Sequence, residues 1–107
     1  MDLPQVIANL ITAQNKFDSV AYSNCFCETG IMLDEGRVHI GRAKISQWII
    51  EGNKKYNPVM RPISFEGDEN KGVLKIEISG TFPGSPLIFT YDLEFVEGLI
   101  QSLTITV

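Results

Sequence analysis

Apolar residues in the first half of the chain recur at helical spacing in three stretches. The first follows Pro4, which suits a first helical turn, and runs to Asn15 with its apolar positions on one face. Asp18 can accept backbone N–H bonds as the cap of a second short helix, which Thr29-Gly30 is expected to end. A third helix is predicted from Gly41, stopped by Asn57-Pro58. Its apolar positions repeat at helical intervals: Ile45, Trp48, Ile49, Gly52 and Tyr56.

The second half alternates between apolar and polar residues, as the strands of an antiparallel sheet do. Between the second and third predicted helices, two short strands are predicted at 31–34 and 38–40, with a turn at Glu35-Gly36 or Gly36-Arg37. Longer strands are predicted at 59–65, 73–82, 87–95 and 99–107. The apolar positions of the central two are Leu74, Ile76, Ile78 and Phe82, then Phe89, Tyr91, Leu93 and Phe95. One sheet face is therefore apolar, and we expect the helices to cover that face.

Length and composition fit one globular domain over residues 1–107. With 44% hydrophobic residues the chain can bury one modest core but not two. Its net charge of -4, from 13 acidic and 9 basic side chains, argues against a nucleic-acid or anionic-membrane partner. Asp2 stands where a signal peptide carries positive charge, and no apolar run is long enough to span a bilayer. A cytoplasmic location is expected.

Asp34 is the first candidate for chemistry. The alternation from Ile31 to Asp34 allows the carboxylate to point inward, where apolar walls would raise its pKa toward that of a useful base. The alternative is a turn-forming aspartate bonded to local backbone amides before Glu35-Gly36. His39, the only histidine, could pair with Asp34 across the tight turn or lie on the hairpin surface.

Aromatic residues supply candidates for ligand contact. Tyr91 lies in the apolar stripe, where its phenol could donate a hydrogen bond to a ligand or find a partner within the core. Five others could line a pocket for a flat or polycyclic apolar ligand, although aromatic residues at these positions also form ordinary cores. They are Trp48, Tyr56, Phe65, Phe82 and Phe89.

Other kinds of site lack sequence support. Asp34, Glu35 and His39 have no recognised metal-ligand spacing, so no metal site is predicted. The chain has no nucleophile motif, phosphate-binding glycine loop or nucleotide fingerprint, and no cofactor is predicted. Cys25 and Cys27 are too close for a relaxed disulfide, which predicts reduced structural thiols.

Several local patterns accompany this order of elements. LDEG occupies positions 33–36, G-x-x-x-I-x-x-W opens the third helix at Gly41, FPGSP occupies 82–86, and the chain closes with Phe95, Gly98, Ile100 and Leu103 as F-x-x-G-x-I-x-x-L. Together they resemble the NTF2-like superfamily, and more narrowly its SnoaL-like branch, which includes polyketide cyclases and relatives of ketosteroid isomerase. The resemblance implies an α+β, cone-like fold with three N-terminal helices packed on a curved, mainly antiparallel sheet.

The resemblance also assigns residues to roles. In the steroid isomerases an aspartate eight residues beyond the phenylalanine that closes helix two abstracts a proton beside a carbonyl, and Asp34 stands eight beyond Phe26. The family's two oxyanion donors fall near Leu10, which cannot donate, and on Tyr91, which can. One donor is therefore missing and the other is substituted.

The resemblance implies an apolar pocket that binds a small organic molecule, with cofactor-free isomerase, cyclase or hydratase chemistry. Asp34 would be the base and Tyr91 would steady negative charge. The missing donor at Leu10 favours the alternative, a non-catalytic ligand-binding or dimerisation module of the same fold. A homodimer through the convex sheet face is expected, with Thr81, Thr90, Ser102, Thr104 and Thr106 as interface candidates.

Overall fold

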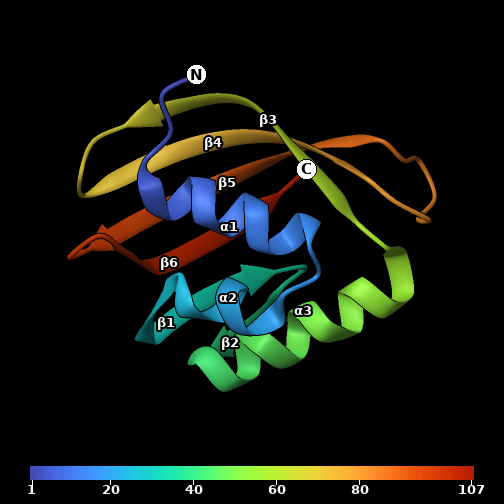
Figure 1. The fold of residues 1–107 in the computed structure, drawn as a ribbon, viewed down its shortest axis with the longest axis horizontal. Coiled ribbons are helices and arrows are strands. Elements are labelled where there is room, and N and C mark those ends of the chain that lie inside the picture. The colour runs from blue at the N-terminus through green and yellow to red at the C-terminus, as the bar shows by residue number, and fades with distance from the viewer.

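The computed structural model describes residues 1–107 as three helices and a six-stranded sheet (Figure 1). The helices are α1 (Gln5–Asn15), α2 (Ser19–Asn24) and α3 (Arg42–Tyr56). The strands are β1 (Phe26–Asp34), β2 (Arg37–Ile40), β3 (Val59–Gly67), β4 (Lys71–Ser79), β5 (Leu87–Val96) and β6 (Leu99–Thr106). The α+β class expected from the sequence is confirmed.

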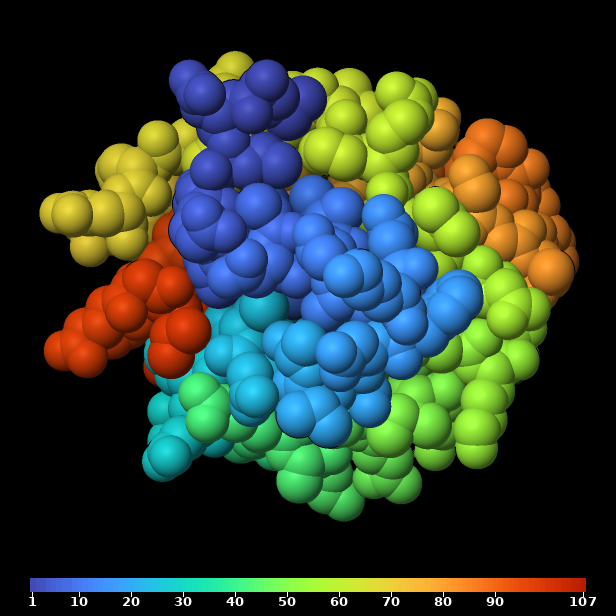
Figure 2. Space-filling view, in the orientation of Figure 1, coloured from blue at the N-terminus to red at the C-terminus, as the bar shows by residue number.

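The strands form one sheet in the order β2-β1-β6-β5-β4-β3. Every neighbouring pair is antiparallel except β1 and β6, which run parallel. The helices gather on one face, where α1 contacts β3, α3 contacts β1 and β2, and α2 contacts both other helices. Figure 2 shows α1 and α2 in blue, with α3 in green, as a continuous covering of this face. None of the helices is both long enough and apolar enough to cross a membrane.

The apolar stripe of the sheet faces the helices, as its alternation predicts. Six stripe positions are buried: Leu74, Ile76, Ile78, Tyr91, Leu93 and Leu103. Lys75, between two of them, is exposed. These side chains join those of the helices in one hydrophobic core. Because a one-residue slip would turn every stripe residue outward, this burial fixes the register of the central strands.

The prediction for residues 26–30 is wrong. The sequence favours a helix up to Thr29-Gly30, but α2 ends at Asn24 and β1 begins at Phe26. Gly30 instead lies within the strand, where the pairing of β1 with β6 shifts register between Phe26 and Ile31. A Cβ at Gly30 would lie 3.0 Å from the Cys27 carbonyl oxygen. The glycine therefore serves a close backbone approach at a bulge, which resembles a helix stop in the sequence.

The prediction that the strand beginning near residue 73 reaches Phe82 is also wrong, since β4 ends at Ser79. The Thr81 backbone N–H donates to the Tyr56 carbonyl at 2.7 Å, and the Thr81 hydroxyl donates to the Lys55 carbonyl at 3.2 Å. These bonds tie the segment to the C-terminal end of α3, so the sheet ladder does not continue through it. Thr81 consequently lies outside the strands.

Both cysteines, Cys25 and Cys27, are free, as their spacing predicts.

Candidate functional site

Asp34 ends β1 on the sheet face that the helices cover. It alternates with Met32, which is fully buried, whereas Ile31 and Leu33 point to the opposite face. The turn after it is made by Glu35 and Gly36, both with positive φ, at 52° and 75°. The Asp34 side chain accepts no hydrogen bond from local backbone amides. The turn therefore does not depend on this side chain. Asp34 is left half-buried at the strand end.

One row of residues across the sheet joins Asp34 to Tyr91. The strand register pairs Asp34 with Ile105 of β6, and Ile105 with Tyr91 of β5. Two strand spacings separate the backbones of Asp34 and Tyr91, about 10 Å. Both side chains rise from the inner face. The Asp34 charge is near enough to raise the pKa of Tyr91, although burial is the larger cause of that rise. Tyr91 therefore stays protonated and can donate a hydrogen bond.

Helices α2 and α3 add aromatic side chains above this row. The Tyr22 ring of α2 lies 5.9 Å from the Phe26 ring and 6.5 Å from the Trp48 ring of α3, measured between centroids. Trp48 also lies 6.1 Å from the His39 ring of β2. We call Tyr22, Asp34, Trp48 and Tyr91 the inner cluster. It combines one carboxylate with two phenols and an indole.

The pKa of Asp34 is raised. Burial is the main cause and the neighbouring Glu35 charge adds to it, while hydrogen bonding from Trp48 and the charge of His39 oppose the rise. Asp34 has no ion pair, since the single salt bridge in the structure joins Arg61 to Glu77 at 3.1 Å. A carboxylate with a raised pKa and no paired cation is a stronger base than an ordinary aspartate.

His39 does not pair with Asp34, which was one of the two arrangements that the sequence left open. No hydrogen bond or ion pair joins the two side chains, and His39 packs instead on Trp48. The register explains this arrangement, because His39 lies opposite Met32, two residues before Asp34 along β1. The influence of His39 on Asp34 is therefore electrostatic, through the pKa effect described above.

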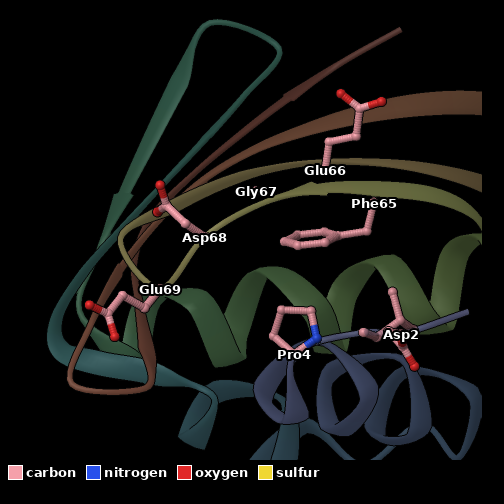
Figure 3. Close-up of a pocket in the computed structure, with 8 residues that line it drawn as sticks. Asp2, Pro4, Phe65, Glu66, Gly67, Asp68 and Glu69 are labelled. Atoms are coloured by element: carbon pink, nitrogen blue, oxygen red, sulfur yellow. The ribbon is translucent and has the colours of Figure 1, made fainter.

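Four of the five aromatic residues considered as pocket lining are partly buried against the one hydrophobic core: Trp48, Phe65, Phe82 and Phe89. Trp48 alone joins the inner cluster. Tyr56 packs edge-on against Phe82 at 5.9 Å, at the far end of α3. Phe65 lies 6.5 Å from Phe95 and borders an open surface cleft, where Figure 3 shows its ring above Pro4. Phe89 packs against the main core.

Tyr22 is a candidate that the sequence pattern did not single out. It is fully buried, yet its hydroxyl has no hydrogen-bond partner. Burial raises its pKa well above the ordinary value, with smaller contributions from Tyr91, Cys25 and Asp34. In the sequence Tyr22 is one apolar position of a short helix, so its spacing cannot distinguish it from core. Only the docking of α2 on α3 and β1 brings Tyr22 close enough for the Asp34 charge to affect its pKa.

The structure offers no cluster of metal-ligating side chains. No group of three or more His, Cys, Asp or Glu side chains could hold a metal ion. The cluster's own groups can accept a proton at Asp34 and donate hydrogen bonds from two phenols. These are the capabilities of acid–base chemistry on an organic molecule, or of binding one.

Comparison with known proteins places the chain among structures of one fold. A proposed polyketide cyclase from Sinorhizobium meliloti is 32% identical, with a TM-score of 0.93 over 99% of this chain and 97% of that one. A protein with a ketosteroid isomerase-like fold from Catenulispora acidiphila, solved in complex with trimethylamine, is 17% identical, with a TM-score of 0.88 over 99% of this chain and 87% of that one. An NTF2-like protein of unknown function from Cytophaga hutchinsonii is 14% identical, with a TM-score of 0.79 over 94% and 85%.

No protein-family model matches the chain, and neither does any curated protein. The two more distant structures establish the fold alone. The Sinorhizobium protein adds substantial identity over nearly the full length of both chains. Together with the order of helices and strands, this likeness shows that the chain belongs to the NTF2-like superfamily as a SnoaL-like relative.

Proposed function

We propose that this protein binds a small, largely apolar organic molecule at the inner cluster, within a cone formed by the helices and the sheet, and that Asp34 removes a proton from it. The observation that carries the proposal is the half-buried Asp34 carboxylate, whose pKa is raised and which has no ion pair. Its neighbours are aromatic, which suits an apolar ligand. The Sinorhizobium relative is a proposed polyketide cyclase, and this activity supports the proposal of such chemistry here.

In this mechanism Asp34 takes a proton from a carbon beside a carbonyl group. The electron pair of the broken C–H bond moves toward the carbonyl oxygen, where Tyr91 donates a hydrogen bond to the developing negative charge. Trp48 lies close enough to Asp34 to oppose the rise in its pKa, and its indole presents an apolar wall to the ligand. Return of the proton to another carbon gives isomerisation, and attack of the carbanion on a second carbonyl gives ring closure. Neither outcome consumes a cofactor.

Asp34→Asn is expected to slow proton abstraction by about 100-fold or more, because the amide cannot accept the proton and positioned bases contribute about that much. The measurement is the exchange of the α-protons of cyclohexanone in D₂O, followed by NMR. Glu51→Gln is the matched control, since Glu51 is an exposed carboxylate on α3 that belongs neither to the inner cluster nor to the uncovered sheet face. Equal exchange by the wild type and Asp34→Asn would eliminate Asp34 as the base.

The second candidate is binding without chemistry. Asp34 is a half-buried carboxylate near aromatic rings and has no paired cation, and such a site also suits a small alkylammonium ion. The Catenulispora structure contains trimethylamine, which favours testing this ligand. Calorimetric titration with trimethylammonium chloride separates the two functions. Tight binding that Asp34→Asn abolishes, with no proton exchange in the wild type, would favour the binding module.

We also propose a homodimer through the sheet face that the helices leave uncovered. Cross-strand pairs on this face include Thr90 with Thr106, Asp92 with Thr104, and Glu94 with Ser102. Exposed Ile88 adds an apolar contact among these polar side chains. Light scattering at tens of micromolar protein is expected to give the mass of two chains, and the mass of one chain would reject the proposal.

A further inference from the structure

The hydroxyl of Tyr22 is the one buried side-chain nitrogen or oxygen in the structure that has no hydrogen-bond partner. A buried hydroxyl without a partner costs free energy, and native proteins rarely leave one in place. Phenylalanine would fill the same volume without that cost. The unpartnered hydroxyl therefore needs an explanation that lies outside the packing of the core.

The surroundings of Tyr22 are those of the inner cluster. Asp18 caps α2 by accepting from the Ala21 N–H at 3.0 Å, and the backbone N–H of Tyr22 donates to the Asp18 carbonyl at 3.0 Å. This cap sets the position of Tyr22 on the helix. The ring is then held between Phe26 and Trp48 at the centroid distances given above. The Tyr22 side chain is fully buried among aromatic rings.

Other groups offer no second donor of this kind. Leu10, on the buried face of α1, is fully buried and apolar. Gln14, also buried on α1, already donates to Asn53 at 2.9 Å and to the Pro58 carbonyl at 3.3 Å. Tyr22 thus carries a buried, unpartnered donor on the helical side of the cluster, while Tyr91 lies on the sheet side.

We propose that Tyr22 Oη donates a hydrogen bond to an oxygen atom of the bound molecule, so that Tyr22 and Tyr91 hold the ligand from the helical side and the sheet side. The ligand class is then a small cyclic compound bearing a carbonyl oxygen. This inference rests on the proposed function, because it places the ligand at the inner cluster. Tyr22 acts as a specificity-determining residue, since an unmet phenol rejects a ligand that lacks the acceptor.

The test compares two molecules of nearly equal shape, cyclohexanone and methylenecyclohexane, of which only the first has an acceptor oxygen. Wild-type protein is expected to bind the ketone about 10-fold more tightly than the hydrocarbon, measured by ligand-detected NMR titration. Tyr22→Phe should abolish this preference by weakening ketone binding, with hydrocarbon binding unchanged. Tyr56→Phe is the control, because Tyr56 lies with Phe82 at the far end of α3, and it should keep the preference.

A thermal melt of Tyr22→Phe supplies the second readout. The melting temperature should stay the same or rise, because no hydrogen bond is lost. A fall of several degrees would show that the hydroxyl is bonded in the free protein, and would overturn the inference. Equal ketone preference in the wild type and Tyr22→Phe would also overturn it, as would a wild type that shows no preference or binds neither probe.

The two proposals fail in different ways. If Tyr22→Phe removes the ketone preference but Asp34→Asn leaves proton exchange unchanged, the role of Asp34 as base fails and the role of Tyr22 stands. If exchange depends on Asp34 while both proteins prefer the ketone equally, only the role of Tyr22 fails.

Discussion

Phe26→Ala is expected to lower the free energy of unfolding by about 3–5 kcal/mol, the usual cost of removing a fully buried aromatic ring. Phe26 is 0% exposed, pairs with Ile100 of β6 and contacts the Tyr22 ring. Its backbone carbonyl also accepts from Arg42 Nε at 2.9 Å, so the site is held from three sides and can collapse only partly. Urea unfolding followed by circular dichroism measures the change.

Two substitutions calibrate this result. Val107→Ala removes a side chain that is 83% exposed and should change stability by about 0.5 kcal/mol or less. Trp48→Ala should cost less than Phe26→Ala, because Trp48 is only partly buried. A Phe26→Ala protein as stable as Val107→Ala would contradict the packing of α2 on β1. A thermal melt little changed by Trp48→Ala would show that the indole lies in a pocket or at the surface and not in the core.

Asp34→Asn is expected to make the protein more stable than the wild type at neutral pH. The pKa of Asp34 is raised in the folded protein, chiefly by burial. Between the ordinary carboxyl value and the raised value, the folded state therefore holds more protons than the unfolded state. Stability falls as the pH rises through that window and stays lower above it. Asparagine carries no charge and avoids this fall, so the two stabilities should converge in acid.

Asp68 supplies a control of opposite sign. Hydrogen bonds from the backbone N–H groups of Asn70 and Lys71 lower its pKa. Its contribution is present above the ordinary carboxyl pKa and disappears as the pH falls through the lowered value. Asp68→Ala should therefore be less stable than the wild type at neutral pH. Chemical unfolding of both variants from acid to neutral pH gives the comparison, and an Asp34→Asn protein less stable at neutral pH would contradict the argument.

The sequence predicts the fold well where one pattern has one structural meaning. The helical spacing from Ile45 to Tyr56 and the alternation in β4 and β5 each require a single buried face, and both are observed. Gly30 has two meanings, because glycine both stops helices and relieves close contacts at bulges. Only the pairing of β1 with β6 decides between them, and that pairing joins distant parts of the chain.

The candidate site is harder to predict for the same reason. Asp34 is recognisable because a carboxylate interrupts an apolar alternation. Tyr22 is not, since a tyrosine at a buried helical position normally finds a partner, and the absence of one appears only after α2, α3 and the sheet are assembled. Phe65, Phe82 and Phe89 share the aromatic character of a pocket wall, but all three also pack against the hydrophobic core, so their spacing does not distinguish a ligand contact from core packing.

The parallel pairing of β1 with β6 has a consequence for the order of assembly during synthesis. Ile105 of β6 lies between Asp34 and Tyr91 in the sheet and pairs with both. The β1–β2 hairpin therefore cannot join the other strands until β6 has been made and has emerged from the ribosome. Because this contact joins segments far apart in the sequence, the loop must close before the contact can contribute any stability, and it is expected to form late. A nascent chain stalled before β6 would hold every residue of the inner cluster without assembling it.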